Sequence, residues 1–221
     1  VTSLLMAEKQ QRTLVTELNH RVRNMLQEII GLCNQIVHRS ADLKQFQAAF
    51  MGRVQSLARA YELLSRDGWK NIPIADLVRT QLSGFAPSRR YTVHGEPVML
   101  SADAALALGL AIYELATNAT KYGALSNAQG QVEVSWAFES GASRDQACSD
   151  TTRKLSIEWS ERGGPPVSVP TRRGFGCELI ERQLKYALNG EAKLDFADAG
   201  LKVTLLIPIK DTVDVSASAV P

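Results

Sequence analysis

The stretch ELNHRVRNMLQEII, residues 17–30, places His20 within a long helical pattern, and its neighbours could support chemistry at that side chain. A histidine is mostly uncharged near neutral pH and keeps a free lone pair, so it can act as a nucleophile. Glu17, one helical turn earlier, could orient the other ring nitrogen, and Arg21 and Asn24 could meet an incoming phosphoryl group. Taken alone, a surface histidine is more often an ordinary solvated residue.

The sequence YELATNATKYG holds a second group, Glu114 and Asn118, which lie four residues apart and therefore on one face of a predicted helix. That helix is otherwise rich in Ala and Leu, so a buried carboxylate and carboxamide would need partners. Oxygen ligands of this kind suit Mg²⁺, which usually binds one or two protein groups together with phosphates. Lys121 follows and could meet phosphate charge. By spacing alone, a solvated helix face is the alternative.

Glycines surround the start of a later predicted helix. Gly163 and Gly164 end a strand, and Gly174 and Gly176 open the helix. Glycines before a helix amino terminus let backbone N–H groups approach phosphate oxygens, although any tight turn also uses them. Glu161, at the strand end, could hold an adenine amino group. The chain contains neither a P-loop nor an early Rossmann glycine fingerprint, so those two kinds of nucleotide site are excluded.

Two long helices are expected to carry His20. Apolar residues recur at helical spacing, and no proline interrupts residues 1–72. The stretch HRSADLKQ, residues 38–45, predicts a turn in which Ser40 or Asp42 caps the second helix. A lone helical hairpin buries little apolar surface, so we expect it to dimerise into a four-helix bundle.

From about residue 67 the pattern changes to mixed helix and strand. Helices are predicted at 74–85, at 102–123, with Gly123 as a terminating glycine, and at 177–188; strands are predicted at 91–95, 131–138, 155–160, 191–198 and 200–209. The fold class is therefore α+β, with several antiparallel strands and helices on one face. We expect a helical hairpin over 1–66, a second domain over 67–210 and a disordered tail over 211–221.

Composition excludes several classes of protein. The net charge of +2 is too small to indicate binding to nucleic acid or to an anionic membrane. No apolar run approaches the roughly 20 residues of a membrane span. Cys33, Cys148 and Cys177 are far apart and odd in number, which predicts a reduced, cytoplasmic protein without a disulfide framework. Because the chain begins at Val1, we expect an upstream part to be missing.

Four motifs in order, ELNHRVRNML, YELATNATKYGALS, WSERGGPPV and GFGCELIER, resemble those of the HWE group of bacterial sensor histidine kinases, close to the HisKA-2 type. The resemblance covers almost the whole chain. It implies that residues 1–66 form a dimerisation and phosphotransfer domain with His20 as the phosphoacceptor. It also implies that residues 67–210 form a GHKL-type α/β sandwich, with a mixed, mostly antiparallel sheet, that binds ATP.

The same resemblance implies roles for the other candidates. Asn118 would coordinate Mg²⁺ between the ATP phosphates, and Glu114 would help to hold the metal or polarise the nucleophile, as a catalytic residue. Trp159 and Glu161 form the W-x-E pair of the family, with Glu161 near adenine. The further ATP-binding residues implied are Lys121, Tyr122, Gly163, Gly164, Gly174, Phe175 and Gly176, the last three closing a short lid.

Two positions depart from the family pattern. Tyr113 replaces the N-box histidine that gives the group part of its name, so an aromatic ring is kept but an imidazole is not. Arg21 follows His20, where the commoner kinases carry an acidic residue. The usual mechanism for dephosphorylating a partner uses that carboxylate, which this chain lacks at the position after His20, so whether the chain has phosphatase activity stays open.

The function implied is ATP-dependent autophosphorylation on His20, followed by transfer to an aspartate of a response regulator receiver domain. The regulator would dock near His20, where Leu18, Val22 and Met25 offer apolar contact. The missing upstream part would be a sensor domain. Two alternatives stay open: a histidine phosphotransfer protein with a non-catalytic ATP-binding-like domain, and a related ATPase working in DNA repair or as a chaperone.

Overall fold

The computed structural model describes residues 2–66, 68–69, 71–139, 153–167, 175–197, 200–209 and 213–214, although several side chains in the first helix lie outside this description. The chain divides into two compact units, Val1–Val54 and Gln55–Pro221. The second unit therefore begins ahead of residue 67, where the sequence pattern changes. Most of the predicted loop 139–154 lies outside the described residues.

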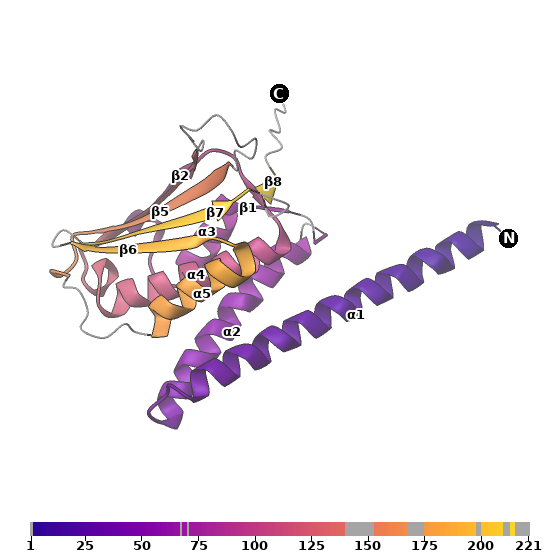
Figure 1. The fold of residues 1–221 in the computed structure, drawn as a ribbon, viewed down its shortest axis with the longest axis horizontal. Coiled ribbons are helices and arrows are strands. Elements are labelled where there is room, and N and C mark those ends of the chain that lie inside the picture. Colours follow the sequence, from indigo (N-terminus) through magenta and orange to yellow (C-terminus); the bar gives the residue numbers. More distant parts are fainter. Residues whose placement is uncertain are drawn as a thin grey trace, which may run out of the picture. The chain divides into compact units, whose positions relative to one another are not determined.

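The first unit is a helical hairpin, in agreement with the sequence pattern. Helix α1 runs over Thr2–Val37, and helix α2 runs over Leu43–Arg66 (Figure 1). Asp42 fixes the turn between them, because its Oδ1 accepts a hydrogen bond from the backbone N–H three residues later at 2.7 Å, as an N-cap does. Ser40, the other candidate cap, instead donates its hydroxyl to the carbonyl of Ile36 at 3.0 Å.

The second half of α2 belongs to the second unit because a buried polar cluster fastens it there. Gln81 donates through Nε2 to the carbonyl of Ser56 at 3.0 Å, and the Ser56 hydroxyl donates to Gln81 Oε1 at 3.1 Å. Arg59 also donates to Gln81 Oε1, through Nε at 3.3 Å. Gln81 and Ser56 are fully buried, so this cluster holds residues 55–66 of α2 against the helix that carries Gln81.

Among the described residues of the second unit, five strands form a sheet in the order β2-β4-β5-β7-β6. The strands are β2 (Tyr91–Gly95), β4 (Gln131–Glu139), β5 (Lys154–Arg162), β6 (Glu191–Ala197) and β7 (Gly200–Pro208). Of these pairings only β2 with β4 is parallel. The predicted α+β class with a mixed, mostly antiparallel sheet is confirmed.

Helices α3 (Ile74–Leu82), α4 (Ala102–Lys121) and α5 (Phe175–Leu188) cover one face of this sheet (Figure 1). Helix α4 is central because it packs against both α3 and α5. It begins after the N-cap Ser101, whose Oγ accepts a backbone N–H three residues later at 3.3 Å. Two short 3₁₀ helices accompany these elements, η1 (Ser88–Arg90) and η2 (Ala124–Ser126).

A second, antiparallel sheet goes beyond the sequence pattern. Its described strands are β1 (Ile72–Pro73), β3 (Met99–Leu100) and β8 (Val213–Asp214), in the order β1-β3-β8. Strand β8 falls within 211–221, where a disordered tail is expected, so the structure differs from that expectation at these two residues. Strands of two residues carry too little alternation to be recognised from sequence.

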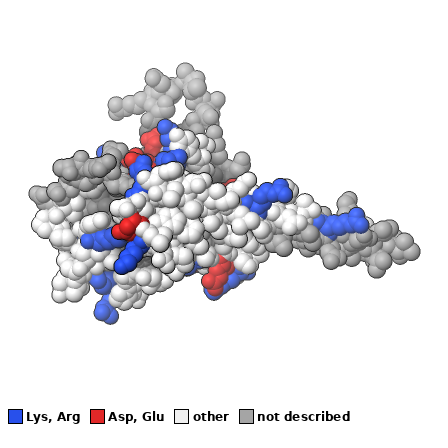
Figure 2. All heavy atoms as spheres, turned by 90° about the horizontal axis from the view of Figure 1, so that it is seen from below, with Lys and Arg blue, Asp and Glu red and all other residues white. Residues whose placement is uncertain are grey.

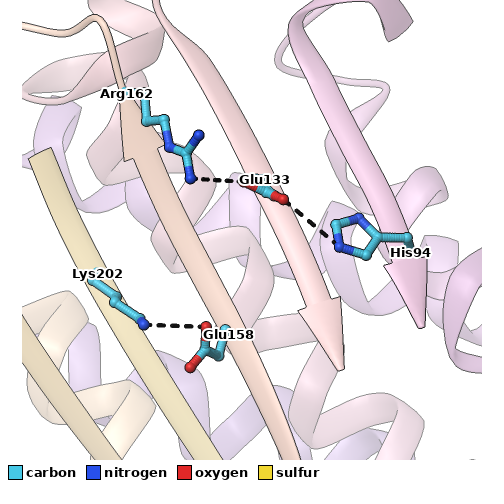
Figure 3. A network of polar contacts seen from close by, with 5 residues as sticks. All are labelled: His94, Glu133, Glu158, Arg162 and Lys202. Atoms are coloured by element: carbon cyan, nitrogen blue, oxygen red, sulfur yellow. Dashed lines mark ion pairs between the residues drawn. The ribbon is translucent and has the colours of Figure 1, made fainter. Parts of the chain in front are cut away.

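Strand β5 shows how the sheet separates its two faces. Leu155, Ile157 and Trp159 alternate along the strand and are at most 1% exposed. Glu158 lies on the opposite face, where it pairs with Lys202 of β7 at 3.2 Å (Figure 3). Side chains alternate across a strand, so the apolar set faces the helices and the charged set faces water.

The water-facing side of the sheet carries further ion pairs. Glu133 of β4 lies between Arg162, at 3.3 Å, and His94, at 3.6 Å (Figure 3). Exposed pairs of this kind contribute little to stability. On the face shown in Figure 2, basic and acidic side chains are interspersed among uncharged residues. Within the part of the chain that the structure describes, no helix is long and apolar enough to cross a membrane.

Candidate active site

Glu114 and Asn118 lie on successive turns of α4 and meet the start of α5. Glu114 is 2% exposed, and Asn118 is half-buried. A Cβ atom on Gly176 would lie 2.9 Å from Glu114 Oε2 and 3.3 Å from Asn118 Nδ2. A glycine is therefore needed for the backbone of α5 to approach both side chains this closely. The structure thus brings together three of the residues expected to bind metal and phosphate.

Trp159 and Glu161 lie two residues apart on β5 and so share one face of that strand. The indole Nε1–H of Trp159 donates to Glu161 Oε1 at 3.0 Å. The other carboxylate oxygen, Oε2, accepts the backbone N–H of Ala124 at 2.7 Å. The W-x-E spacing is therefore a same-face hydrogen-bonded pair, and it ties β5 to the segment that follows α4.

Glu161 is a carboxylate on the buried face of the sheet and is only 3% exposed. Burial raises the pKa of Glu161 above its ordinary value, and the hydrogen bonds from Ala124 and Trp159 offset part of that rise. A carboxylate has about four lone-pair sites. The two donors seen here leave it able to accept a further hydrogen bond, such as one from a ligand amino group.

Gly123 serves a purpose other than ending the helix. Helix α4 ends at Lys121, and Gly123 has φ −112°, which is not the left-handed conformation of a terminating glycine. A Cβ atom on Gly123 would lie only 1.9 Å from Glu161 Oε2. The close approach of Glu161 to the backbone after α4 therefore explains this glycine.

The glycine pair after β5 packs against the same segment. Gly163 adopts a left-handed φ of 69°. A Cβ atom on Gly164 would lie 2.8 Å from the backbone nitrogen of Ala124, so the two backbones are in direct contact. Of the expected lid residues, Gly174 lies outside the described residues; Phe175 begins α5, but its side chain also lies outside the description.

Lys121 is the last residue of α4 and Tyr122 is its C-cap; both side chains are exposed, Tyr122 to 73%. They are therefore accessible to a ligand at the end of the helix. Tyr113, at the family's N-box histidine position, instead packs against Phe85, with 5.4 Å between the ring centroids. The aromatic ring at this position thus contributes to packing against the segment that follows α3.

His20 lies in α1 with an exposed side chain, as do Arg23 and Asn24. The side chains of Glu17, Leu18 and Arg21 lie outside the described residues. Val22, Leu26 and Ile30 follow one another at four-residue spacing and are 43%, 50% and 59% exposed. Hereafter they are called the apolar stripe of α1. Each residue of an α-helix turns the side-chain direction by about 100°, so this stripe lies on a different side of the helix from His20.

Two residues near the site lie outside every motif recognised in the sequence. Arg90 of η1 and Asn127, after η2, both hydrogen-bond to the backbone between α4 and β4. Their contacts join segments far apart in the chain, which spacing rules do not reveal. The only sequence signal is the density of Gly, Ser and Asn in GALSNAQGQ, which is typical of a tight loop.

The chain is similar to a known family and to curated proteins. The family model described as "HWE histidine kinase" matches residues 17–97. A blue-light-activated histidine kinase of Brucella anthropi is 34% identical over 217 residues, which are 97% of this chain and 42% of that protein. The protein of the same name from Brucella ovis is 32% identical over 215 residues, 96% of this chain and 42% of that protein. The chain thus spans about two fifths of the length of these relatives.

The fold was compared with solved structures. The Erythrobacter litoralis EL346 blue-light activated histidine kinase matches with a TM-score of 0.63 at 19% identity, covering 87% of this chain and 60% of that one. The separate histidine kinase domain of the same protein matches with a TM-score of 0.54 at 19% identity, covering 82% of this chain and 94% of that one. At this level of identity the likeness establishes the fold.

The chain therefore has the fold of a histidine kinase core. In this fold, helices precede an α+β domain with a mixed sheet. Within that class it is similar to the HWE histidine kinases, and among curated proteins to those named as activated by blue light. The resemblance predicted from the four motifs is confirmed.

Proposed function

We propose that this chain is the ATP-dependent kinase core of a two-component signalling protein, which phosphorylates itself on His20 and passes the phosphoryl group to an aspartate of a response regulator. The observation that carries the proposal is the convergence of Glu114 and Asn118 with the backbone at Gly176, at the start of α5. The curated relatives, which are named histidine kinases, support it.

The residues present fit a magnesium ion held together with ATP. Glu114 and Asn118 offer a carboxylate and a carboxamide oxygen, the hard ligands that Mg²⁺ prefers. Among the described residues, no group of three or more His, Cys, Asp or Glu side chains could hold a metal. A cation bound by these two residues would take its remaining ligands from water and from phosphate oxygens, so metal and nucleotide binding would support each other.

The buried side of β5 would receive the nucleotide base. Glu161 keeps acceptor capacity beyond its bonds to Trp159 and Ala124, so it could accept a hydrogen bond from the adenine amino group. Trp159 is 1% exposed and would act through Glu161, by holding one carboxylate oxygen in place. Gly163 and Gly164 would let backbone groups approach the nucleotide closely, while Lys121 and Tyr122 would line its accessible edge.

Phosphoryl transfer would depend mainly on positioning and charge stabilisation. When bound, Mg²⁺ would offset the negative charge of the phosphates. His20 would attack in line through Nε2, so that a nitrogen–phosphorus bond forms while the bond from the γ-phosphorus to the bridging oxygen of ADP breaks. His20 is exposed on α1, as a nucleophile that must meet a separate nucleotide site and then a receiver domain needs to be.

The exposed side chains of the hairpin indicate which partners it could bind. We propose a homodimer through the hairpin, because the apolar stripe of α1 is exposed and a four-helix bundle would bury it. A receiver domain would dock close to His20. The curated relatives extend well beyond the part matched by this chain, which fits an upstream sensor domain. The chemistry would take place in the cytoplasm, where the two described cysteines, Cys33 and Cys177, would stay reduced.

Titration with a fluorescent ATP analogue, with and without Mg²⁺, tests the nucleotide site. The parent chain should bind the analogue more tightly when Mg²⁺ is present, and Asn118→Ala should lose that enhancement. Asn34→Ser, a change of an exposed amide on α1, should keep it. An affinity for the analogue that does not respond to Mg²⁺ would contradict the assignment of Glu114 and Asn118.

A further inference from the structure

The segment between α4 and β4, residues 122–130, is hereafter called the α4–β4 loop. It follows the helix that carries Asn118, and its residue Ala124 donates to Glu161. The loop therefore connects the metal-binding and base-binding parts of the proposed site. Its own conformation is set by two side chains outside every motif of the family resemblance, Arg90 and Asn127.

Arg90 approaches the loop from η1 and gathers its carbonyl groups. The guanidinium donates to the carbonyl of Gly130 from Nε at 3.0 Å and from Nη2 at 2.8 Å. The same Nη2 donates to the carbonyl of Ala124 at 3.3 Å and also to that of Asn127. One planar cation thus binds carbonyls from both ends of the loop. The point charge of a lysine cannot reproduce this geometry.

Asn127 connects the loop to the glycine pair after β5. Its Oδ1 accepts the backbone N–H groups of Gln129, at 3.1 Å, and Gly130, at 2.8 Å. Its Nδ2 donates to the carbonyl of Gly163 at 3.0 Å. The side chain therefore closes the turn of the loop and joins it to the segment expected to lie beside the nucleotide.

The packing around the loop leaves little room for adjustment. A Cβ atom on Gly130 would lie 1.8 Å from the carbonyl oxygen of Ala124, and one on Gly164 would lie 2.7 Å from the Ala124 Cα. A shift of Ala124 would therefore displace Gly164. Through the hydrogen bond at 2.7 Å it would also displace the carboxylate of Glu161. Because Arg90 holds the Ala124 carbonyl, it controls the position of these groups from a distance.

We propose that Arg90 is a positioning residue for nucleotide binding, which fixes the α4–β4 loop so that Glu161, Gly163 and Gly164 are arranged to receive ATP. This inference rests on the proposed kinase function. Arg90 acts through the loop and not through the nucleotide itself. Its loss should therefore weaken ATP binding and leave the transfer step nearly unchanged once ATP is bound.

The test compares Arg90→Gln and Arg90→Lys with Arg89→Gln, a matched change at the exposed neighbouring arginine. The rate of autophosphorylation is measured as a function of ATP concentration. Arg90→Gln should raise the ATP concentration at half-maximal rate about tenfold, because the α4–β4 loop would no longer be held in place before ATP binds. The rate at saturating ATP should change less than about twofold.

Arg90→Lys keeps the charge but not the fork of donors, so it should rescue binding only in part. Arg89→Gln should match the parent chain. The dissociation constant of a fluorescent ATP analogue should follow the same order, which gives a readout independent of phosphoryl transfer. If Arg90→Gln does not fold, Arg90→Lys carries the same test, with its thermal unfolding midpoint compared with that of the parent.

Equal ATP dependence of Arg90→Gln and Arg89→Gln would overturn the positioning role, as would a fall in the saturating rate with no change in the ATP dependence. In both cases the parent chain would still bind ATP and incorporate phosphate. A parent chain that does neither would instead contradict the proposed function on which this inference rests. The two failures are therefore distinguishable.

Discussion

The middle of helix α1 and strand β5 differ in how far they expose their apolar residues. In the hairpin, Val22, Leu26 and Ile30 are 43–59% exposed, whereas Leu155 and Trp159 of the sandwich are at most 1% exposed. The sandwich has its own core and holds Glu161 within it. The hairpin keeps both its apolar stripe and His20 accessible. Under the proposed function, the second unit would hold the nucleotide and the hairpin would present His20 to its partners.

The largest effect is expected for a substitution that leaves a cavity in the core of the second unit. Trp159→Ala should lower the free energy of unfolding by about 3–5 kcal/mol, because a large aromatic side chain is lost from a fully buried site. Urea denaturation followed by circular dichroism measures this. Trp159→Phe keeps most of the volume but removes the N–H donor to Glu161 and part of the ring system. Its decrease in unfolding free energy should therefore be clearly smaller. Equal losses would show that the hydrogen bond, and not packing, dominates at this position.

Strand β5 carries both a buried and an exposed glutamate, so their contributions to stability can be compared within one strand. Glu161→Ala removes the acceptor of two buried N–H groups and should cost about 1–3 kcal/mol of unfolding free energy for each donor left unpaired. Glu158→Ala removes an exposed pair with Lys202 and should cost about 1 kcal/mol or less. Chemical denaturation of both variants gives the values. If Glu158→Ala lowered the free energy of unfolding as much as Glu161→Ala, the buried and exposed faces of the sheet would not differ in their contribution to stability.

Substitutions in the apolar stripe of α1 are expected to change the association of two chains and not the stability of the core. Leu26→Glu places a charge in the apolar stripe and should weaken the dimer about tenfold or more. Gln27→Glu adds the same charge at the neighbouring exposed position and should weaken it less. Sedimentation equilibrium measures both dissociation constants. Unchanged association in Leu26→Glu would place the dimer contact elsewhere.

The smallest effect expected is a dependence on pH. Burial raises the pKa of Glu161, so the folded chain holds that proton more tightly than the unfolded chain does. As the pH falls through the folded pKa, the parent chain should therefore gain unfolding free energy relative to Glu161→Gln, and the gain should be complete below the unfolded pKa. Denaturation of both proteins over an acid pH series measures it. A shift in the opposite direction would mean that the two N–H donors outweigh burial.

The sequence predicts those features that depend on local periodicity. The hairpin, a cap at either Ser40 or Asp42 and the five longer strands follow from spacing and turn residues. The W-x-E pair shares a face because strand side chains alternate. What the sequence does not predict depends on contacts between distant segments. Gly123 is needed because Glu161 approaches it, and Arg90 is needed because loop carbonyls converge on it.

The central claim is that ATP held near Asn118 phosphorylates His20, and labelling with γ-labelled ATP and Mg²⁺ tests it most directly. The parent chain and His38→Ala, a change at another exposed histidine of the hairpin, should both gain an acid-labile, alkali-stable label. His20→Ala and Asn118→Ala should gain none. Label that persists in His20→Ala would contradict the assignment of the phosphoacceptor. A parent chain that neither binds ATP nor takes up label would contradict the kinase account and favour a histidine phosphotransfer protein.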